Sequence, residues 1–154
     1  MIERDKCLHF KAGYKYVITR PFRIKTEIRP PFTRRITRQT VDVNNTAVVI
    51  PLVTLEPSGW LTIHAGYAYD GASGPTIDTL DSMAGAAVHD AGYQLIRLGK
   101  IEPTWKEYFD ELFYEIMVED GMIRPRAKLW EWAVKTFGRS ATRPGAEPKE
   151  QVAP

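Results

Sequence analysis

The spacing of apolar residues changes once along the chain, near residues 69–75 (YDGASGP), and this change limits the fold more than any other feature. Before it, short segments rich in Val, Ile, Thr and Tyr partly alternate between apolar and polar residues, and proline and glycine separate them, which is typical of strands. After it, apolar residues recur with helical spacing. The sequence therefore predicts an α+β fold, with a mainly antiparallel β region over residues 1–68 followed by a helical unit over residues 69–138.

Three helices are predicted in the second half of the chain. The first spans about 78–98, and the second begins near Thr104, whose spacing to Glu107 fits a capping box, and ends at Gly121. The third covers residues 125–138 and has a proline in its first turn. Because the connection between the first two helices is short, we expect them to form an antiparallel hairpin.

Two segments are predicted to lie outside these elements. Residues 29–39 (RPPFTRRITRQ) are predicted to form an exposed loop or arm, because prolines begin the segment and basic residues fill it. Residues 139–154 have the polar, proline-containing composition of a disordered or linker-like tail. The pattern leaves open whether the β region and the helical unit share one compact domain.

Charge is unevenly distributed along the chain, although the net charge is only +2. Residues 11–38 contain nine Lys or Arg and one acid, whereas residues 102–120 contain seven acids and one base. Two interpretations stay open: solvated basic and acidic faces, or a basic patch that meets phosphate on lipid or nucleic acid. The small net charge makes nucleic acid the less favoured partner.

The single cysteine, Cys7, excludes an intrachain disulfide, so the fold needs no oxidising compartment. The first residues are charged and lack the apolar stretch of a signal peptide, and no apolar run is long enough to cross a membrane. We therefore expect the chain to be made in the cytoplasm. It would meet a membrane only from the surface or as part of a larger particle.

The candidate site lies in AAVHDAGYQLIR, residues 86–97, where His89 stands in a segment of small and apolar residues. In an antiparallel hairpin, residues equally far from the turn lie opposite each other, which places Asp110 of the second helix across from His89. Ala86 and Gly85, one turn before His89, are expected to leave a notch over its ring. A histidine held by a carboxylate on one nitrogen, with space at the other, has the arrangement of a general base.

Asp90 lies about 100° further around the same helix, so it is expected to face a different neighbour, the loop that contains Asp70. Two carboxylates together with carbonyl groups of a glycine-containing loop predict a calcium site. A zinc site is less favoured, because His9, His64 and His89 do not have the clustered spacing of zinc ligands.

These residues also carry a family resemblance. YDGASGP followed by AAVHDAGY resembles a domain family of unknown function that is common in phages and prophages, and residues 69–138 resemble the bacterial secreted phospholipases of the A-two class. In those phospholipases one helix carries HDxxY and a second helix carries DxxF…M. The resemblance implies that His89 is the base, that Asp90 binds calcium and that Asp110 orients the histidine. It matches Tyr93 to the tyrosine of the first motif, and whether that hydroxyl bonds Asp110 or another acceptor stays open.

The resemblance extends to the calcium-binding loop, where it assigns Asp70 and the backbone carbonyl of Gly71 to the metal. The phospholipases usually carry cysteines in this loop and near the HD helix, whereas this chain has small residues there, such as Ala72. Residues 1–68 are not covered by the phospholipase resemblance and are similar to the front part of the phage family.

Two functions from different classes stay open. The first is a phage-encoded, calcium-dependent ester hydrolase of the phospholipase type, in which His89 activates water, acting at a phospholipid or membrane surface. The second is a virion structural component of a tail, baseplate or capsid. That component would keep the scaffold without turnover and would dock other virion proteins through the β half and the tail. The sequence decides neither the turnover nor the oligomeric state.

Overall fold

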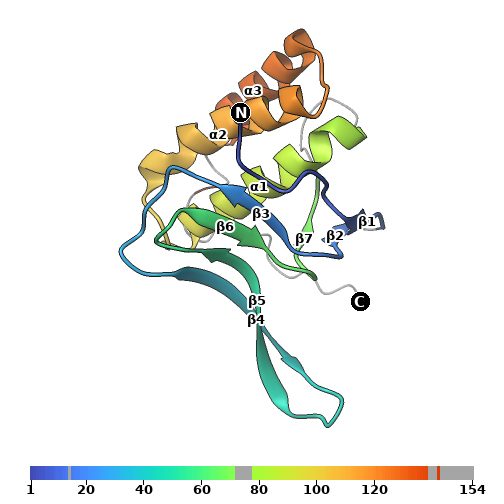
Figure 1. The fold of residues 1–154 in the computed structure, drawn as a ribbon, viewed down its shortest axis with the longest axis vertical. Coiled ribbons are helices and arrows are strands. Elements are labelled where there is room, and N and C mark those ends of the chain that lie inside the picture. The colour runs from blue at the N-terminus through green and yellow to red at the C-terminus, as the bar shows by residue number, and fades with distance from the viewer. Residues whose placement is uncertain (14, 72–77, 139–141, 143–154) are drawn as a thin grey trace, which may run out of the picture.

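The computed structural model describes residues 1–13, 15–71, 78–138 and 142, and Figure 1 shows how their elements are arranged. Within these residues, seven strands precede one 3₁₀ helix and three α-helices. The order confirms the predicted α+β fold, with an antiparallel β region first and a helical unit after it. The predicted tail, residues 139–154, lies outside the described residues except for residue 142.

The strands form two antiparallel sheets. One has the order β1-β2-β7 and the other the order β3-β6-β5-β4. In the larger sheet, alternate residues face the helices, because burial alternates along β3, β6 and the second half of β5. The strand bounds are β1 Phe10–Lys11, β2 Tyr16–Ile18, β3 Phe22–Lys25, β4 Arg34–Val41, β5 Ala47–Leu55, β6 Trp60–Ile63 and β7 Ala68–Tyr69.

Strand β4 corrects the second part of the prediction of an exposed loop or arm over residues 29–39, because residues 34–39 belong to the strand. Arg34–Val41 pairs in antiparallel register with β5, so that Arg34 lies opposite Leu55 and Val41 lies opposite Ala47. The arginines in this segment interrupt the alternation of apolar and polar residues from which a strand is predicted. Pairing with the apolar β5 overrides the weak local preference, as strand formation depends strongly on neighbours across the sheet.

Three α-helices follow the sheets: α1 Leu80–Arg97, α2 Lys106–Glu119 and α3 Arg124–Phe137, with a 3₁₀ turn, η1 Pro103–Trp105, before α2. Glycines end the first two helices as predicted. Gly99 and Gly121 adopt φ of 68° and 103°, a left-handed conformation that only glycine enters without strain. At each end, amides of the following residues close back onto carbonyls of the last turn, which is the Schellman arrangement.

The capping box predicted at Thr104 and Glu107 is wrong. Thr104 lies within the 3₁₀ turn, and its hydroxyl donates a hydrogen bond to Glu102 instead of capping α2. The structure has its capping box at the start of α1, between Thr79 and Ser82. Proline favours the first turn of a helix, so the 3₁₀ turn begins at Pro103, one residue before the predicted cap at Thr104.

Helix α1 packs at the centre of the fold, between β6 of the larger sheet and α2. This position explains its many alanines and glycines, because small side chains let elements approach closely on both sides. Buried residues of the sheets and of the helices join in one hydrophobic core, which includes Phe22, Leu55, Leu61, Ile63, Leu95, Phe113 and Trp130.

None of the helices in the described part of the chain is long and apolar enough to cross a membrane. This agrees with the absence of a membrane-spanning run in the sequence.

Candidate functional site

Close packing of α1 against α2 brings the candidate residues together. A Cβ added at Gly92 would overlap the ring of Phe109, which is fully buried on α2. Glycine at this position therefore lets the two helices approach at the level of the site. His89 and Tyr93 lie one helical turn apart on α1, on either side of Gly92 in the chain, and the turn between the helices places Asp110 opposite both.

Asp110 is the centre of the site. Its side chain is fully buried and accepts three hydrogen bonds. On one carboxylate oxygen, Oδ1, it accepts from His89 Nε2 at 2.8 Å and from the Tyr93 hydroxyl at 2.5 Å. On the other oxygen, Oδ2, it accepts from Lys106 Nζ at 2.6 Å. These contacts agree with the predicted pairing of His89 with Asp110, and they show that Tyr93 bonds Asp110.

These contacts leave Asp110 ionised. Burial raises the pKa of the Asp110 carboxyl, but hydrogen bonds from His89, Lys106 and Tyr93 outweigh burial and hold the pKa below its usual value. Because an ionised carboxylate only accepts hydrogen bonds, His89 Nε2 carries the proton that is shared with Asp110. The neutral imidazole therefore has its lone pair on Nδ1.

His89 itself is tuned in two opposite directions. Burial lowers the pKa of its imidazole, whereas the hydrogen bond to Asp110 and the nearby negative charge of Asp90 raise it, and the net pKa lies above the usual value. Nδ1 lies 4.0 Å from an Asp90 carboxylate oxygen. The nitrogen that can act as a base thus faces the side of the helix on which Asp90 stands.

The predicted notch over the imidazole is filled. A Cβ added at Gly85 would lie 2.8 Å from the Phe113 ring, so this ring occupies the space that the small residue leaves. The Phe113 and Tyr93 rings lie 5.2 and 3.9 Å from the His89 ring, centroid to centroid. Only 8% of the His89 side chain is exposed. The neighbouring helix thus fills the space beside the small residues of α1. The spacing of residues within α1 could not reveal this.

Asp90 is the most accessible acid next to the histidine, with 33% of its side chain exposed. Burial raises the pKa of its carboxyl, and the nearby His89 imidazole opposes that shift. The backbone of Asp70 also acts on this carboxyl and lowers its pKa. The segment that contains Asp70 therefore meets Asp90 as predicted, but it does so through its backbone.

The side chain of Asp70 points elsewhere. Its carboxylate is 65% exposed and lies 3.3 Å from the ammonium group of Lys15. Gly71 is buried, with φ of 85°, and packs against Asp78 and the Tyr16 ring, so any larger residue there would clash. Within the described residues, no group of three or more His, Cys, Asp or Glu side chains is placed to hold a metal ion. The remainder of the predicted loop, residues 72–77, lies outside the described residues.

Lys106 is the site residue that sequence reasoning missed. It stands four residues before Asp110, a spacing at which helical side chains meet, and it is the only base in the acidic run 102–120. The contact between Lys106 and Asp110 could have been predicted from their spacing of four residues on one helix. Lys106 also lies 5.5 Å from the centroid of the Tyr93 ring, so it contacts two members of the site.

Comparison of the chain with family models, with curated proteins and with solved structures found no match. The function is therefore argued from the geometry of the site.

Proposed function

We propose that the chain is an ester hydrolase of the phospholipase type in which His89 is the general base. The observation that carries the proposal is the hydrogen bond of 2.8 Å between His89 Nε2 and the buried Asp110, which leaves Nδ1 as the basic atom. A histidine with one nitrogen fixed by a carboxylate and the other free to take a proton is the common arrangement for activating water. The likeness of HDxxY and DxxF to the phospholipase motifs supports the same assignment.

In the proposed reaction, His89 Nδ1 takes a proton from water as the water oxygen attacks the ester carbonyl carbon. The tetrahedral intermediate then collapses, the bond to the leaving alcohol breaks, and the imidazolium returns the proton to the leaving oxygen. Asp110 stabilises the imidazolium while it exists. Tyr93 and Lys106 hold the Asp110 carboxylate in place, so the pair keeps its geometry through the cycle. The substrate class we propose is a phospholipid presented at a membrane surface.

Calcium is the proposed cofactor, with Asp90, Asp70 and the Gly71 carbonyl as its ligands. Calcium takes six to eight oxygen ligands, and the described residues offer fewer, because the Asp70 carboxylate pairs with Lys15. The described residues therefore do not by themselves form a complete calcium site. The proton transfers above are derived without the ion.

A second function is a structural component of a virion that keeps this scaffold without turnover. One observation favours it: the His89 side chain is 8% exposed and lies between two aromatic rings. A buried histidine that is held by a carboxylate and packed between rings stabilises a core without any chemistry. Incorporation of the chain into a phage particle belongs to this proposal.

Release of fatty acid from mixed phospholipid vesicles, measured with and without calcium, separates the two functions. The hydrolase should release fatty acid, and His89→Gln should abolish release while the melting temperature changes little. His64→Gln is a matched control, because it makes the same change at a histidine that bonds Thr54 on the sheet, away from the site. Absence of release by the wild-type chain on any vesicle composition would favour the structural role.

A further inference from the structure

Strands β4 and β5 extend beyond the sheet to which they belong. Strand β6 pairs with β5 only along Val53–Leu55, so the part of the hairpin beyond that point has no third strand beside it. Figure 1 shows this part projecting from the body of the molecule. We call residues 37–51 the arm.

A bulge and a proline separate the arm from the sheet. Ile36 lies opposite Val53, but Thr37 lies opposite Pro51, so Leu52 is left without a partner in β4. A bulge bends a strand pair, and Pro51 has no amide hydrogen to offer a neighbouring strand. Both features keep a further strand of the same chain from continuing the sheet along β5.

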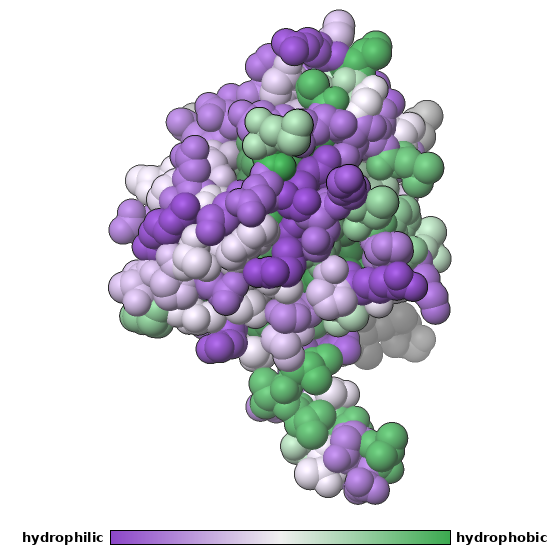
Figure 2. Space-filling view, viewed as in Figure 1, coloured by the Kyte–Doolittle hydropathy of each residue, from purple (hydrophilic) through white to green (hydrophobic). Residues whose placement is uncertain are grey.

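The arm carries apolar side chains, mostly from β5, on both of its faces. Val41 and Val49 lie on one face and are 58% and 61% exposed, and the half-buried Val48 and Ile50 lie on the other. Figure 2 shows hydrophobic residues along the arm, where it stands away from the body. Exposed apolar side chains that gather on a projecting element mark interaction sites. The arm therefore has the features of an interaction surface.

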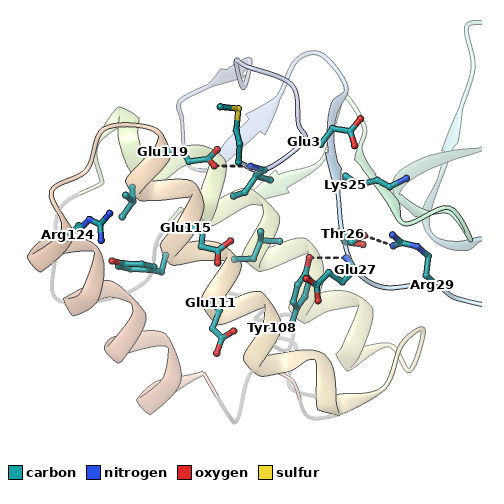
Figure 3. Close-up of a pocket in the computed structure, with 15 residues that line it drawn as sticks. Glu3, Lys25, Thr26, Glu27, Arg29, Tyr108, Glu111, Glu115, Glu119 and Arg124 are labelled. Carbon is teal, nitrogen blue, oxygen red and sulfur yellow. Dashed lines mark hydrogen bonds between the residues drawn. The ribbon is translucent and has the colours of Figure 1, made fainter.

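A groove with an apolar and charged lining lies on the body of the molecule, away from the arm. It is a cavity of about 700 Å³ between α2 and the segment that contains the N-terminus and β3. Its apolar lining includes Ile2, Leu112 and Val118. Figure 3 shows Glu111, Glu115 and Glu119 along α2 on one side, with Lys25, Thr26 and Arg29 across from them. Five acidic and three basic residues line it, so its charge is net negative, and we call it the acidic groove.

Charge makes the groove and the arm complementary. Glu107, Glu111 and Glu115 follow one another at intervals of four along α2, a spacing at which like charges repel and destabilise a helix, whereas Glu119, the next in the series, pairs with Arg4. A basic occupant would relieve this repulsion. Exposed Arg35 and Arg38 lie on β4 at the base of the arm and in its first part, beside the apolar residues of β5. Asp42 in the turn is the one acid, so residues 35–51 have a net charge of +1.

We infer that the arm of one copy of this chain binds in the acidic groove of a second copy. Figure 1 shows the arm projecting away from α2 and β3, whose residues line the groove, so the arm does not fill the groove of its own chain. Such a contact joins two different surfaces and leaves one of each free on every pair. It therefore propagates into a closed ring or an open chain of copies.

Sedimentation velocity on the full chain tests this inference. The wild type should form species larger than a dimer as its concentration rises. Arg38→Glu in the arm and Glu115→Arg in the groove should each weaken association by on the order of tenfold or more, because each places like charges in contact. Arg20→Glu and Glu102→Arg reverse exposed charges outside both surfaces and should leave association unchanged. A wild type that stays monomeric at its highest soluble concentration would overturn the inference.

Mixing the two variants distinguishes this contact from any other. Arg38→Glu copies have an acidic arm and an acidic groove, and Glu115→Arg copies keep Arg35 and Arg38 and have a groove of reduced negative charge. Neither should assemble alone, but together they offer opposite charges at the altered contact, and the mixture should recover complexes that contain both. Melting temperatures near that of the wild type show that both variants fold. Complexes that either variant forms alone as well as the wild type, or a mixture that stays monomeric, would refute the inference.

Discussion

Lys106 Nζ lies 2.6 Å from Oδ2 of Asp110, on the carboxylate oxygen that neither His89 nor Tyr93 uses. The lysine therefore does not compete with the histidine for the same oxygen. Its positive charge offsets part of the negative charge of Asp110 that acts on His89. Lys106 therefore limits how strongly Asp110 raises the pKa of the imidazole. Four side chains from two helices act here as one polar unit inside an apolar core.

His89 and Asp110 should behave as a single unit in catalysis. His89→Gln should lower fatty-acid release by roughly 10²- to 10⁴-fold, the usual contribution of a positioned base. Asp110→Asn should also lower release, because the imidazole loses its fixed tautomer. The double variant should be little worse than His89→Gln. If the two single losses multiply instead, the residues act independently and the proposed mechanism is wrong.

Activity should rise with pH through the titration of His89. Asp110 and Asp90 raise the pKa of its imidazole above 6.5, and only the neutral form can take a proton. The same shift affects folding in the opposite sense. Its stabilising contribution is fully present below pH 6.5 and is lost as the pH rises through the raised pKa. Titration of the histidine ring protons by NMR checks the shift. His64, whose pKa is lowered by burial, should titrate below His89.

Lys106→Met should raise the pKa of His89 further, because a positive charge near the imidazolium is removed while the methionine keeps most of the side-chain volume. The acidic limb of the pH–activity profile should then move to higher pH. Lys100→Met, a partly exposed lysine in the connection between α1 and η1, is the control and should leave the His89 titration unchanged. An unchanged His89 pKa in Lys106→Met would mean that the lysine does not influence the imidazole.

Calcium should bind with modest affinity, with a Kd of roughly 10⁻⁴ to 10⁻³ M, because few carboxylates are available to it. Titration calorimetry should show binding heat for the wild type that is lost in Asp90→Asn. Asp42→Asn is a suitable control, because this exposed carboxylate lies in the β4–β5 turn. Equal heats for the wild type and Asp90→Asn would exclude Asp90 as a ligand.

Gly92→Ala should destabilise the fold although alanine favours helices. The added Cβ overlaps the buried Phe109 ring, and overpacking of this kind costs about 1–3 kcal/mol. The gain in helix propensity is about 1 kcal/mol at most, so the loss should dominate. Chemical denaturation measures the difference. Phe109→Leu should partly rescue the Gly92→Ala variant, whereas purely additive losses would show that the two residues do not share the contact.

The sequence allowed the pairing of His89 with Asp110 to be predicted, because a short turn between two helices sets which residues face each other. It also allowed the β-to-helix order to be predicted, because that order depends only on the period of the apolar pattern. The filling of the notch by Phe113 and the outward direction of the Asp70 side chain could not be predicted. Both depend on packing and charge contacts with residues outside the motif. The strand at Arg34–Val41 was missed for the same reason.

The arm lies outside the core, so the rest of the fold does not constrain the length of the arm. Side chains in a strand repeat every two residues, so inserting or deleting one residue on each side of the turn at Asn45 exchanges the two faces of the tip. Inserting or deleting two residues on each side restores them. Arms of different length are thus compatible with an identical body. In related chains, length changes in steps of two residues per strand would alter the reach between subunits while the His89–Asp110 pair stays as it is.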